Sequence, residues 1–266
     1  MSEPRFDVTF GATTHPGLVR SSNEDSYLTV PPVFLVADGM GGHARGELAS
    51  RAVVDTFSDL STRTWLTSDD LVGAVQRAVG RIAGLAGEGR APGSTLAGVG
   101  LTQHGGMPCW LVFNIGDSRT LLFRGGELNQ ISVDHSAAVR ARTEGAASAA
   151  RNVITRALGA GLAMPVADQW LIPAVVGDRM LICSDGLSNE VTAELLLATL
   201  MSIADPQEAA STLVQAALSS GGRDNITAVV VDCVELVSTA SHDVAADDST
   251  ASSEVDDTVP DVVEVA

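Results

Sequence analysis

The sequence contains no lysine, and all 16 of its basic residues are arginine. Enzymes that form Schiff bases and nucleotidases that use a P-loop need a lysine, so both classes are excluded. Cysteine is also scarce: Cys109, Cys183 and Cys233 include no CxxC pair and are odd in number. Each lies in an apolar stretch typical of a strand, which favours buried free thiols over disulfides, zinc ligands or a cysteine nucleophile.

Long hydrophobic runs are missing as well. No stretch approaches the roughly 18 apolar residues that a transmembrane helix needs. Residues 1–10 lack the basic and apolar regions of a secretory signal peptide. We therefore expect a cytoplasmic protein that does not cross a membrane, with one medium-sized domain in its 266 residues.

Positive charge is heavily outnumbered. The net charge is −17, and residues 235–266 contain nine acidic residues but no arginine or lysine. Such a charge disfavours nucleic acids and anionic membranes as partners. Residues 237–266 also lack aromatic side chains and apolar periodicity, so we predict that they form an acidic, disordered C-terminal tail.

The apolar pattern predicts an α+β fold built on antiparallel sheets. Residues 6–30 are expected to form a strand, a loop and a second strand, and further strands are expected at 34–38, 95–132 (a series of hairpins), 168–176, 179–184 and 226–234. Helices are expected at 44–58, 69–87, 191–202 and 206–219. Because strands come in hairpin-like groups without regular alternation with helices, the helices should pack outside the sheets.

Four aspartates lie next to these predicted strands. Asp38, Asp117 and Asp185 each follow an apolar run, and Asp224 precedes one. An acid at the end of one strand and an acid at the start of an antiparallel neighbour lie at the same sheet edge. Carboxylates gathered at a dry edge repel one another and need a cation. A single Asp-Gly pair is more often only a turn, so the hypothesis depends on the shared context of all four.

Oxygen ligands without a His/Cys cluster favour Mg or Mn over zinc. Two such ions about 3.5–4 Å apart can lower the pKa of a shared water and screen the charge of an anionic substrate. The segment RSSNEDS (20–26) adds Arg20, whose planar guanidinium is suited to bind two phosphate oxygens. Taken alone, this segment is equally well explained as a polar loop. His43 and His135 also lie near these segments, and we interpret both as incidental loop histidines.

A series of short motifs carries a family resemblance. In chain order these are RSSNEDS, VADGMGG, GSTLAG, NIGDSR, DHS, RNVITRALG, CSDGL and GRDNITAVVVD. The series resembles that of the PPM-type, metal-dependent serine/threonine protein phosphatases (type 2C), bacterial branch, over residues 6–234. The resemblance implies a four-layer α-β-β-α sandwich of two antiparallel sheets flanked by paired helices. It also implies that residues 1–236 form the catalytic domain and that residues 237–266 form the tail.

The resemblance implies a role for each matching residue. Two permanent Mn or Mg ions would be held by Asp38, the Gly39 carbonyl, Asp185, Asp224 and, through water, Glu24. Asp25 and Asn225 would support this network, and Asp117 would share a third, weaker metal with Asp185. Arg20 would bind the substrate phosphate while a water activated by the metals attacks phosphorus.

Two positions depart from the family pattern. Some members place a general-acid histidine directly after the Asp-Gly, where this chain has Met40. The segment corresponding to the flap beside the active site, residues 137–152, is several residues shorter than usual. Substrate choice and affinity for the third metal are the properties that these departures affect.

The implied function is hydrolysis of phosphoserine and phosphothreonine in proteins, which reverses the action of bacterial Ser/Thr kinases. The expected partners are those kinases and their phosphorylated substrates, and a monomer is expected. Two alternatives stay open at this point. One is a catalytically weak regulator that binds phosphoproteins on the same fold, and the other is a phosphatase of small phosphate esters.

Overall fold

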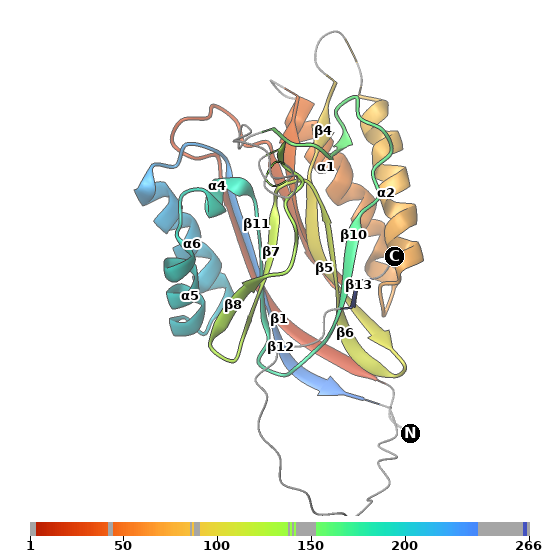
Figure 1. The fold of residues 1–266 in the computed structure, drawn as a ribbon, viewed down its shortest axis with the longest axis vertical. Helices are drawn as coiled ribbons and strands as arrows, with labels where there is room; N and C mark the ends of the chain where they lie inside the picture. Colours follow the sequence, from red (N-terminus) through yellow and green to blue (C-terminus); the bar gives the residue numbers. More distant parts are fainter. Residues whose placement is uncertain are drawn as a thin grey trace, which may run out of the picture.

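The computed structural model describes residues 4–41, 45–85, 87, 91–137, 139, 141 and 153–238, together with the backbone of 263–264. Two antiparallel sheets lie face to face, with helices on the outer side of each (Figure 1). The α+β sandwich expected from the sequence is therefore confirmed. Among the described helices, none is long and apolar enough to cross a membrane.

The first sheet has five strands. Their order is β1 (Arg5–His15), β12 (Ile226–Val237), β11 (Arg179–Cys183), β7 (Arg119–Arg124) and β8 (Glu127–Gln130). The first and last long strands of the chain pair along their whole length, from Arg5 opposite Val237 to His15 opposite Ile226. This pairing brings the loop after β1 next to the loop before β12.

The second sheet is larger. Its main strands are β10 (Asp168–Pro173), β6 (Met107–Ile115), β5 (Leu96–His104), β3 (Val33–Met40) and β2 (Asp25–Val30). Two short strands, β4 (Gly93–Ser94) and β9 (Leu158–Gly159), continue it beyond the end of β3. At the opposite edge, β13 (Val263–Glu264) pairs with β10. Most of the tail expected at 237–266 lies outside the described residues, which include only 237–238 and the backbone of 263–264 from this segment.

Helices cover the outer sides of the two sheets (Figure 1). They are α1 (Arg45–Ser58) with a 3₁₀ turn at Asp59–Thr62, α2 (Ser68–Ala83), the single turn α4 (Asp185–Ser188), α5 (Ala193–Ser202) and α6 (Pro206–Ser220). The capping box of Thr67 and Asp70 opens α2, and Asp205 caps α6 before a proline. The helix predicted at 69–87 ends earlier, at Ala83, with Gly84 as its C-cap residue.

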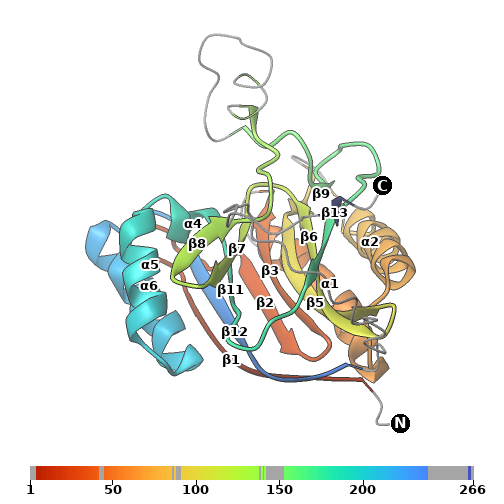
Figure 2. The same ribbon diagram turned by 60° about the horizontal axis from the view of Figure 1, so that its bottom comes forward.

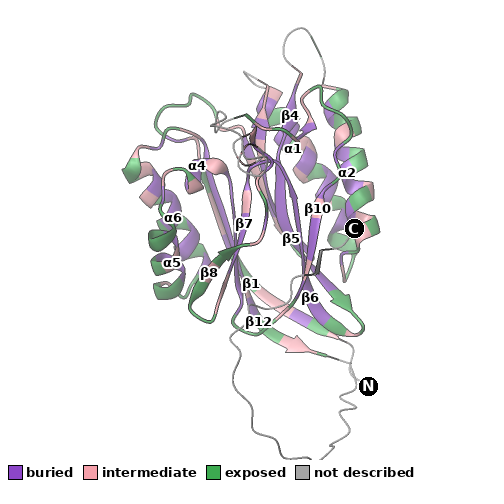
Figure 3. Cartoon of the chain, viewed as in Figure 1, coloured by how far each residue is buried: buried purple, intermediate pink, exposed green. Residues whose placement is uncertain are grey.

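Three apolar clusters fill the three interfaces of the sandwich. One lies between α1, α2 and the second sheet, one between the two sheets, and one between α5, α6 and the first sheet. Buried residues accordingly follow the strands and the inner faces of the helices in Figure 3, whereas the outer helix faces are exposed. Seen from the side in Figure 2, the helix pairs stand on opposite sides of the strands. The three cysteines are buried and free, as predicted.

Candidate active site

Four aspartates that are far apart in the sequence line one cavity in the structure. They are Asp38 in β3, Asp117 after β6, Asp185 after β11 and Asp224 before β12. The cavity has a volume of about 740 Å³, and Arg20 and Glu24 also line it. The antiparallel pairing of the strands brings these ends to one edge of the sandwich, as the sequence pattern predicts.

The carboxyl groups of this cavity shift one another's pKa. Burial, followed by repulsion from the neighbouring aspartates, raises the pKa of Asp38 well above its usual value. Burial and repulsion from Asp185 raise the pKa of Asp117 to about 7. Burial likewise raises the pKa of Asp25, which lies behind the cavity, to about 7. A cluster of acids in this situation is stabilised by positive charge.

The oxygen atoms of the cavity suit hard divalent cations. Asp25 Oδ1 and Asp117 Oδ1 are buried and have no hydrogen-bond partner. Carboxylate and carbonyl oxygens are the ligands that Mg and Mn prefer, so the donor set fits these ions. In the described part of the chain, however, no three acidic, histidine or cysteine side chains are arranged around one point as metal ligands. Asp224 Oδ2 instead accepts a hydrogen bond from Arg20 Nη2 at 2.7 Å.

Two glycines let the chain approach Glu24 closely. The Gly39 N–H donates to the Glu24 carbonyl at 3.1 Å, and a Cβ at Gly39 would lie 2.1 Å from the Gly46 carbonyl oxygen. A Cβ at Gly46 would lie 2.2 Å from Glu24 Oε2. A side chain at Gly39 would therefore collide with backbone, and one at Gly46 would displace the Glu24 carboxylate. The Glu24 carboxylate is thus held between the end of β3 and the start of α1, beside Asp38.

The side chain of Asn225 joins the loop before β12 to the loop after β1. Its Oδ1 accepts a hydrogen bond from the Glu24 N–H at 2.8 Å. Its Nδ2 donates to the carbonyls of Pro16 at 3.0 Å and Ser22 at 2.8 Å. The loop that carries Arg20 is therefore fixed relative to Asp224 by one buried amide group.

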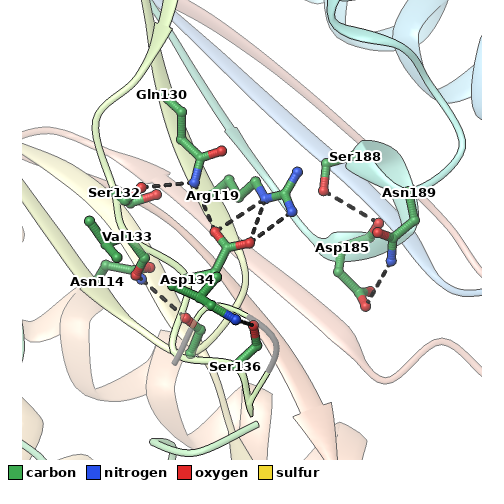
Figure 4. A network of polar contacts seen from close by, with 12 residues as sticks. Asn114, Arg119, Gln130, Ser132, Val133, Asp134, Ser136, Asp185, Ser188 and Asn189 are labelled. Atoms are coloured by element: carbon green, nitrogen blue, oxygen red, sulfur yellow. Dashed lines mark hydrogen bonds and ion pairs between the residues drawn. The ribbon is translucent and has the colours of Figure 1, made fainter. Parts of the chain in front are cut away.

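Arg119 lies on the side of the cavity where Asp117 and Asp185 are. Figure 4 shows its guanidinium between two acids, Asp134 and Asp185. The ion pair with Asp134 uses Nε at 3.0 Å and Nη2 at 2.7 Å. Asp185 accepts a hydrogen bond from Asn189 Nδ2 at 3.2 Å. The charge of Arg119 lowers the pKa of Asp185, but burial and repulsion from Asp224 outweigh it, so the pKa of Asp185 is raised.

With this arrangement of acids and arginine established, the chain can be compared with known proteins. Residues 21–220 match the family model described as protein phosphatase 2C. The chain belongs to the protein phosphatase 2C family. The family resemblance of the eight sequence motifs is thereby confirmed.

Relatives at 30% identity or more extend this assignment. The serine/threonine protein phosphatase PstP of Mycobacterium tuberculosis is 37% identical over 246 residues, which cover 88% of this chain and 47% of the relative. The serine/threonine phosphatase Stp of Listeria monocytogenes is 30% identical over 236 residues, covering 82% of this chain and 93% of the relative. The chain thus spans about half the length of PstP but nearly the full length of Stp.

Solved structures of phosphatase 2C proteins have the same fold. The crystal structure of M. tuberculosis PstP superposes with a TM-score of 0.79 at 33% identity, covering 86% of this chain and 99% of that structure. A structure of the PstP catalytic domain in complex with two manganese ions gives a TM-score of 0.77 at 34% identity, covering 87% and 100%.

Thr95 is a residue of this phosphatase 2C site to which the sequence pattern assigned no role. Its N–H donates to the Asp38 carbonyl, and its Oγ1 accepts a hydrogen bond from the Asp38 N–H, both at 2.9 Å. The same hydroxyl is 2.7 Å from Ser118 Oγ. Thr95 and Ser118 are fully buried. Thr95 therefore links the backbone at Asp38 to the turn that carries Asp117. Thr95 belongs to the GSTLAG motif, so the motif series could have pointed to this residue.

His135 is also part of the site's framework, and its interpretation as an incidental loop histidine is wrong. Its Nδ1 accepts a hydrogen bond from the Gly116 N–H at 3.0 Å, and its Nε2 donates to Asp168 Oδ2 at 2.9 Å. Arg156 also pairs with Asp168. Burial lowers the pKa of His135 despite the Asp168 carboxylate, so the ring is neutral at pH 7. The neutral ring holds the backbone next to Asp117.

The structure describes one of the two positions that depart from the family pattern, Met40, but little of the other, residues 137–152. Met40 lies at the end of β3 and lines the cavity, so no titratable side chain stands at that position. Most of residues 137–152, where a shortened flap is predicted, and His43 lie outside the described residues. The segment that follows the flap is described, and Val153, Ile154 and Leu162 line the cavity.

Proposed function

We propose that the chain is a metal-dependent protein phosphatase that hydrolyses phosphoserine and phosphothreonine. The observation that carries this proposal is the composition of the cavity, in which an arginine lies beside aspartates with raised pKa values. Such a cavity can hold cations and a phosphate together, because the cations offset the charge of both. The activities that the names of PstP and Stp state support the same conclusion.

In this proposal, the cavity binds two Mn or Mg ions. The ligands are Asp38, the Gly39 carbonyl, Asp185, Asp224 and, through water, Glu24, with Asp117 and Asp185 offering a third, weaker site. The complex of the PstP catalytic domain with two manganese ions supports this assignment. When bound, the ions would supply an activated water and charge neutralisation.

The protein's own residues bind and orient the phosphate group. Arg20 contributes a planar guanidinium that can donate two parallel hydrogen bonds to phosphate oxygens, once it releases Asp224. Asn225 keeps the Arg20 loop in place. Met40 can neither donate nor accept a proton, so proton transfer to the leaving oxygen does not use the residue after the Asp-Gly.

The proposed substrates are phosphorylated proteins, among them Ser/Thr kinases and the targets of those kinases. The proposed catalytic domain comprises residues 1–236 and acts as a cytoplasmic monomer, and residues 237–266 form an acidic tail. No basic patch that would attract nucleic acid is expected at a net charge of −17.

The test is dephosphorylation of a phosphothreonine peptide by the purified full chain, with and without added Mn or Mg. We expect turnover only with the metal, and Asp38→Asn should abolish it. Isothermal titration with Mn supplies a readout that does not depend on activity, because the variant should lose the tighter binding event. Full activity of Asp38→Asn, or equal activity in a chelator, would refute the metal assignment. Higher kcat/KM on a small phosphate ester than on the peptide would contradict the protein substrate.

A further inference from the structure

Three large apolar side chains are more exposed than any other in the described residues, and each lies within four residues of one that lines the cavity. Val166 is 74% exposed, Val19 69% and Leu18 67%. Isolated exposed apolar side chains are common on protein surfaces and need no explanation. Here, however, two of the three are consecutive and directly precede Arg20, which lines the cavity. We call the surface formed by Leu18 and Val19 the apolar ledge.

The backbone beneath the apolar ledge is held firmly. The Leu18 N–H donates to the Gly222 carbonyl at 2.7 Å. Gly17 has a positive φ of 82°, and a Cβ there would lie 2.2 Å from the Asp224 carbonyl oxygen. The Gly17 N–H donates to His15 Nδ1 at 2.9 Å. With the amide of Asn225 bonded to Pro16 and Ser22 as well, the loop cannot fold inward to bury its apolar side chains.

A second exposed apolar stretch borders the cavity elsewhere. Leu162 lines the cavity, and Met164 and Val166 follow it at 55% and 74% exposure. Their backbone is also anchored, because the Val166 carbonyl accepts a hydrogen bond from Arg156 Nη1 at 3.2 Å. In Figure 1 this segment runs beside α2, whereas the loop between β1 and β2 lies toward α4 and α6. Exposed apolar side chains therefore adjoin cavity-lining residues in two separate segments, before Arg20 and after Leu162.

We propose that the apolar ledge binds the substrate polypeptide next to the phosphorylated residue and favours apolar side chains there. The inference rests on the proposed function, because it places the phosphate at Arg20. Val19 and Leu18 lie one and two residues from Arg20, which is a reach of at most roughly 7 Å along an extended chain. The occupant is a polypeptide rather than a small ester, since only a chain that continues beyond the phosphate extends over the ledge.

The energetics of apolar burial support a role for the apolar ledge in selecting substrates by the side chains that flank the phosphorylated residue. A rigid apolar surface loses no backbone entropy when a partner binds, so burial of apolar area contributes directly to affinity. A flanking Leu or Val of the substrate would remove water from both surfaces. A flanking Ser or Gly offers little area to bury, and a flanking charged group would be desolvated without a partner.

The experiment compares the double variant Leu18→Ser/Val19→Ser with the control Val175→Ser/Val176→Ser. The control pair is similarly apolar and exposed, at 47% and 57%, and lies in the turn between β10 and β11 at the other end of the sandwich. Both are assayed with Mn on a phosphothreonine peptide with Leu and Val flanks, a matched peptide with Ser and Gly flanks, and p-nitrophenyl phosphate. Thermal melting verifies that both variants fold.

For the ledge variant, the ratio of kcat/KM on the apolar peptide to kcat/KM on p-nitrophenyl phosphate should fall about tenfold, through KM, which corresponds to about 1.4 kcal/mol. The ratio for the polar peptide, and both ratios for the control, should stay at the wild-type values. An equal loss on all three substrates would overturn the proposal, because it would mean that the loop only positions Arg20. An unchanged ratio would overturn it as well.

Failure of the underlying function gives a different pattern. Wild-type protein that turns over none of the three substrates contradicts the proposed function. Fluorescence anisotropy with the labelled peptides then still tests the ledge. Tighter binding of the apolar peptide by the wild type, lost in the ledge variant, supports the ledge even without turnover. Equal affinity for both peptides overturns it.

Discussion

An aspartate lies beyond each end of β11, and the two have opposite surroundings. Asp178, which precedes the strand, is fully satisfied: Trp110 Nε1 donates to it at 2.9 Å, Arg124 Nε at 2.6 Å and the Val175 N–H at 2.9 Å. Asp185, which follows the strand, is repelled by Asp224 and, among the described residues, accepts one hydrogen bond from a side chain, that of Asn189. The same residue type therefore has an ion-pair partner at one end of the sandwich, whereas at the other end burial and repulsion from Asp224 outweigh the nearby arginine charge.

This difference indicates that burying the carboxylates of the cavity costs folding free energy, and that the protein's own positive charges do not fully compensate for it. Buried carboxylates normally have partners, because an unpaired buried charge is expensive. At the Asp178 end, Arg124 supplies the partner. At the cavity end, Arg20 pairs with Asp224 while Asp25 and Asp117 each keep one oxygen without a partner. In our proposal, cations bound in the cavity offset this excess of negative charge.

Asp185→Asn should produce the largest effect on activity. Loss of one ligand from the proposed site should lower kcat/KM on a phosphopeptide by roughly 10³-fold, comparable to the loss of one preorganised electrostatic group. Stability measured by urea unfolding in a chelator should not fall, because the substitution removes repulsion. Reduced stability in the chelator would show that Asp185 resembles Asp178 and would break the comparison.

Asp178→Asn should produce the opposite result. The asparagine would leave the positive charge of Arg124 without its partner, and we expect a loss of about 2–4 kcal/mol in the free energy of unfolding. The lower part of the usual range applies because the Arg124 side chain is 24% exposed. Activity below the melting transition should stay near that of the wild type. Urea unfolding and phosphopeptide kinetics on the same preparation make the measurement.

Thr95→Val should affect both stability and metal affinity, which sharpens the comparison at the cavity end. Valine keeps the shape of threonine but leaves the Asp38 N–H without an acceptor, at a cost of about 1–3 kcal/mol. We also expect weaker Mn binding by calorimetry, because the Asp38 and Asp117 turns lose their shared hydroxyl. Thr95→Ser is the matched control and should restore both properties. A serine variant as impaired as the valine variant would assign the effect to packing alone.

His135→Asn should produce the smallest effect, visible in the pH dependence of stability. The folded-state pKa of His135 lies below the ordinary value of 6.5, so the folded protein binds fewer protons than the unfolded chain near that pH. The stability that the neutral ring contributes is fully present above pH 6.5 and is lost as the pH falls toward the folded-state pKa. The difference in unfolding free energy between wild type and variant should therefore shrink from pH 7.5 to pH 5.5. A difference that stays constant would contradict a neutral buried ring.

Titration of Asp168 does not contribute to the change in stability expected between pH 7.5 and pH 5.5. Partial burial raises its pKa, but hydrogen bonds from His135 and Arg156 lower it more, so the net pKa lies below the usual value. Its contribution to stability is therefore present above the ordinary aspartate pKa of about 3.9 and is lost only at lower pH.

The sequence predicted the fold well, because the strands that form the sandwich are apolar runs bounded by clear turn signals. It also predicted that Asp38, Asp117, Asp185 and Asp224 lie near one another, since antiparallel strands place such ends at one edge. The bounds of α2 were less accurate, because no breaker stronger than Gly84 separates the helix from the residues after it.

The framework around the aspartates was harder to predict. Thr95 and His135 act through backbone groups of residues far away in the chain, such as Asp38 and Gly116. A hydrogen bond of this kind depends on three-dimensional distance and leaves no periodic signal in the sequence. The apolar ledge was missed for a related reason, since Leu18 and Val19 look like ordinary core residues until the anchoring of their loop is known.

The bonds of the Asn225 side chain also constrain how the protein folds. They connect residues up to 209 positions apart, and Arg20 and Asp224 are 204 positions apart. Contacts of such high sequence separation form slowly, after loop closure has been achieved. During synthesis, the amino-terminal half therefore leaves the ribosome with its arginine but without Asp185 or Asp224. A nascent or truncated chain that ends before β12 is expected to be inactive, so the competent site appears only when the last long strand pairs with the first.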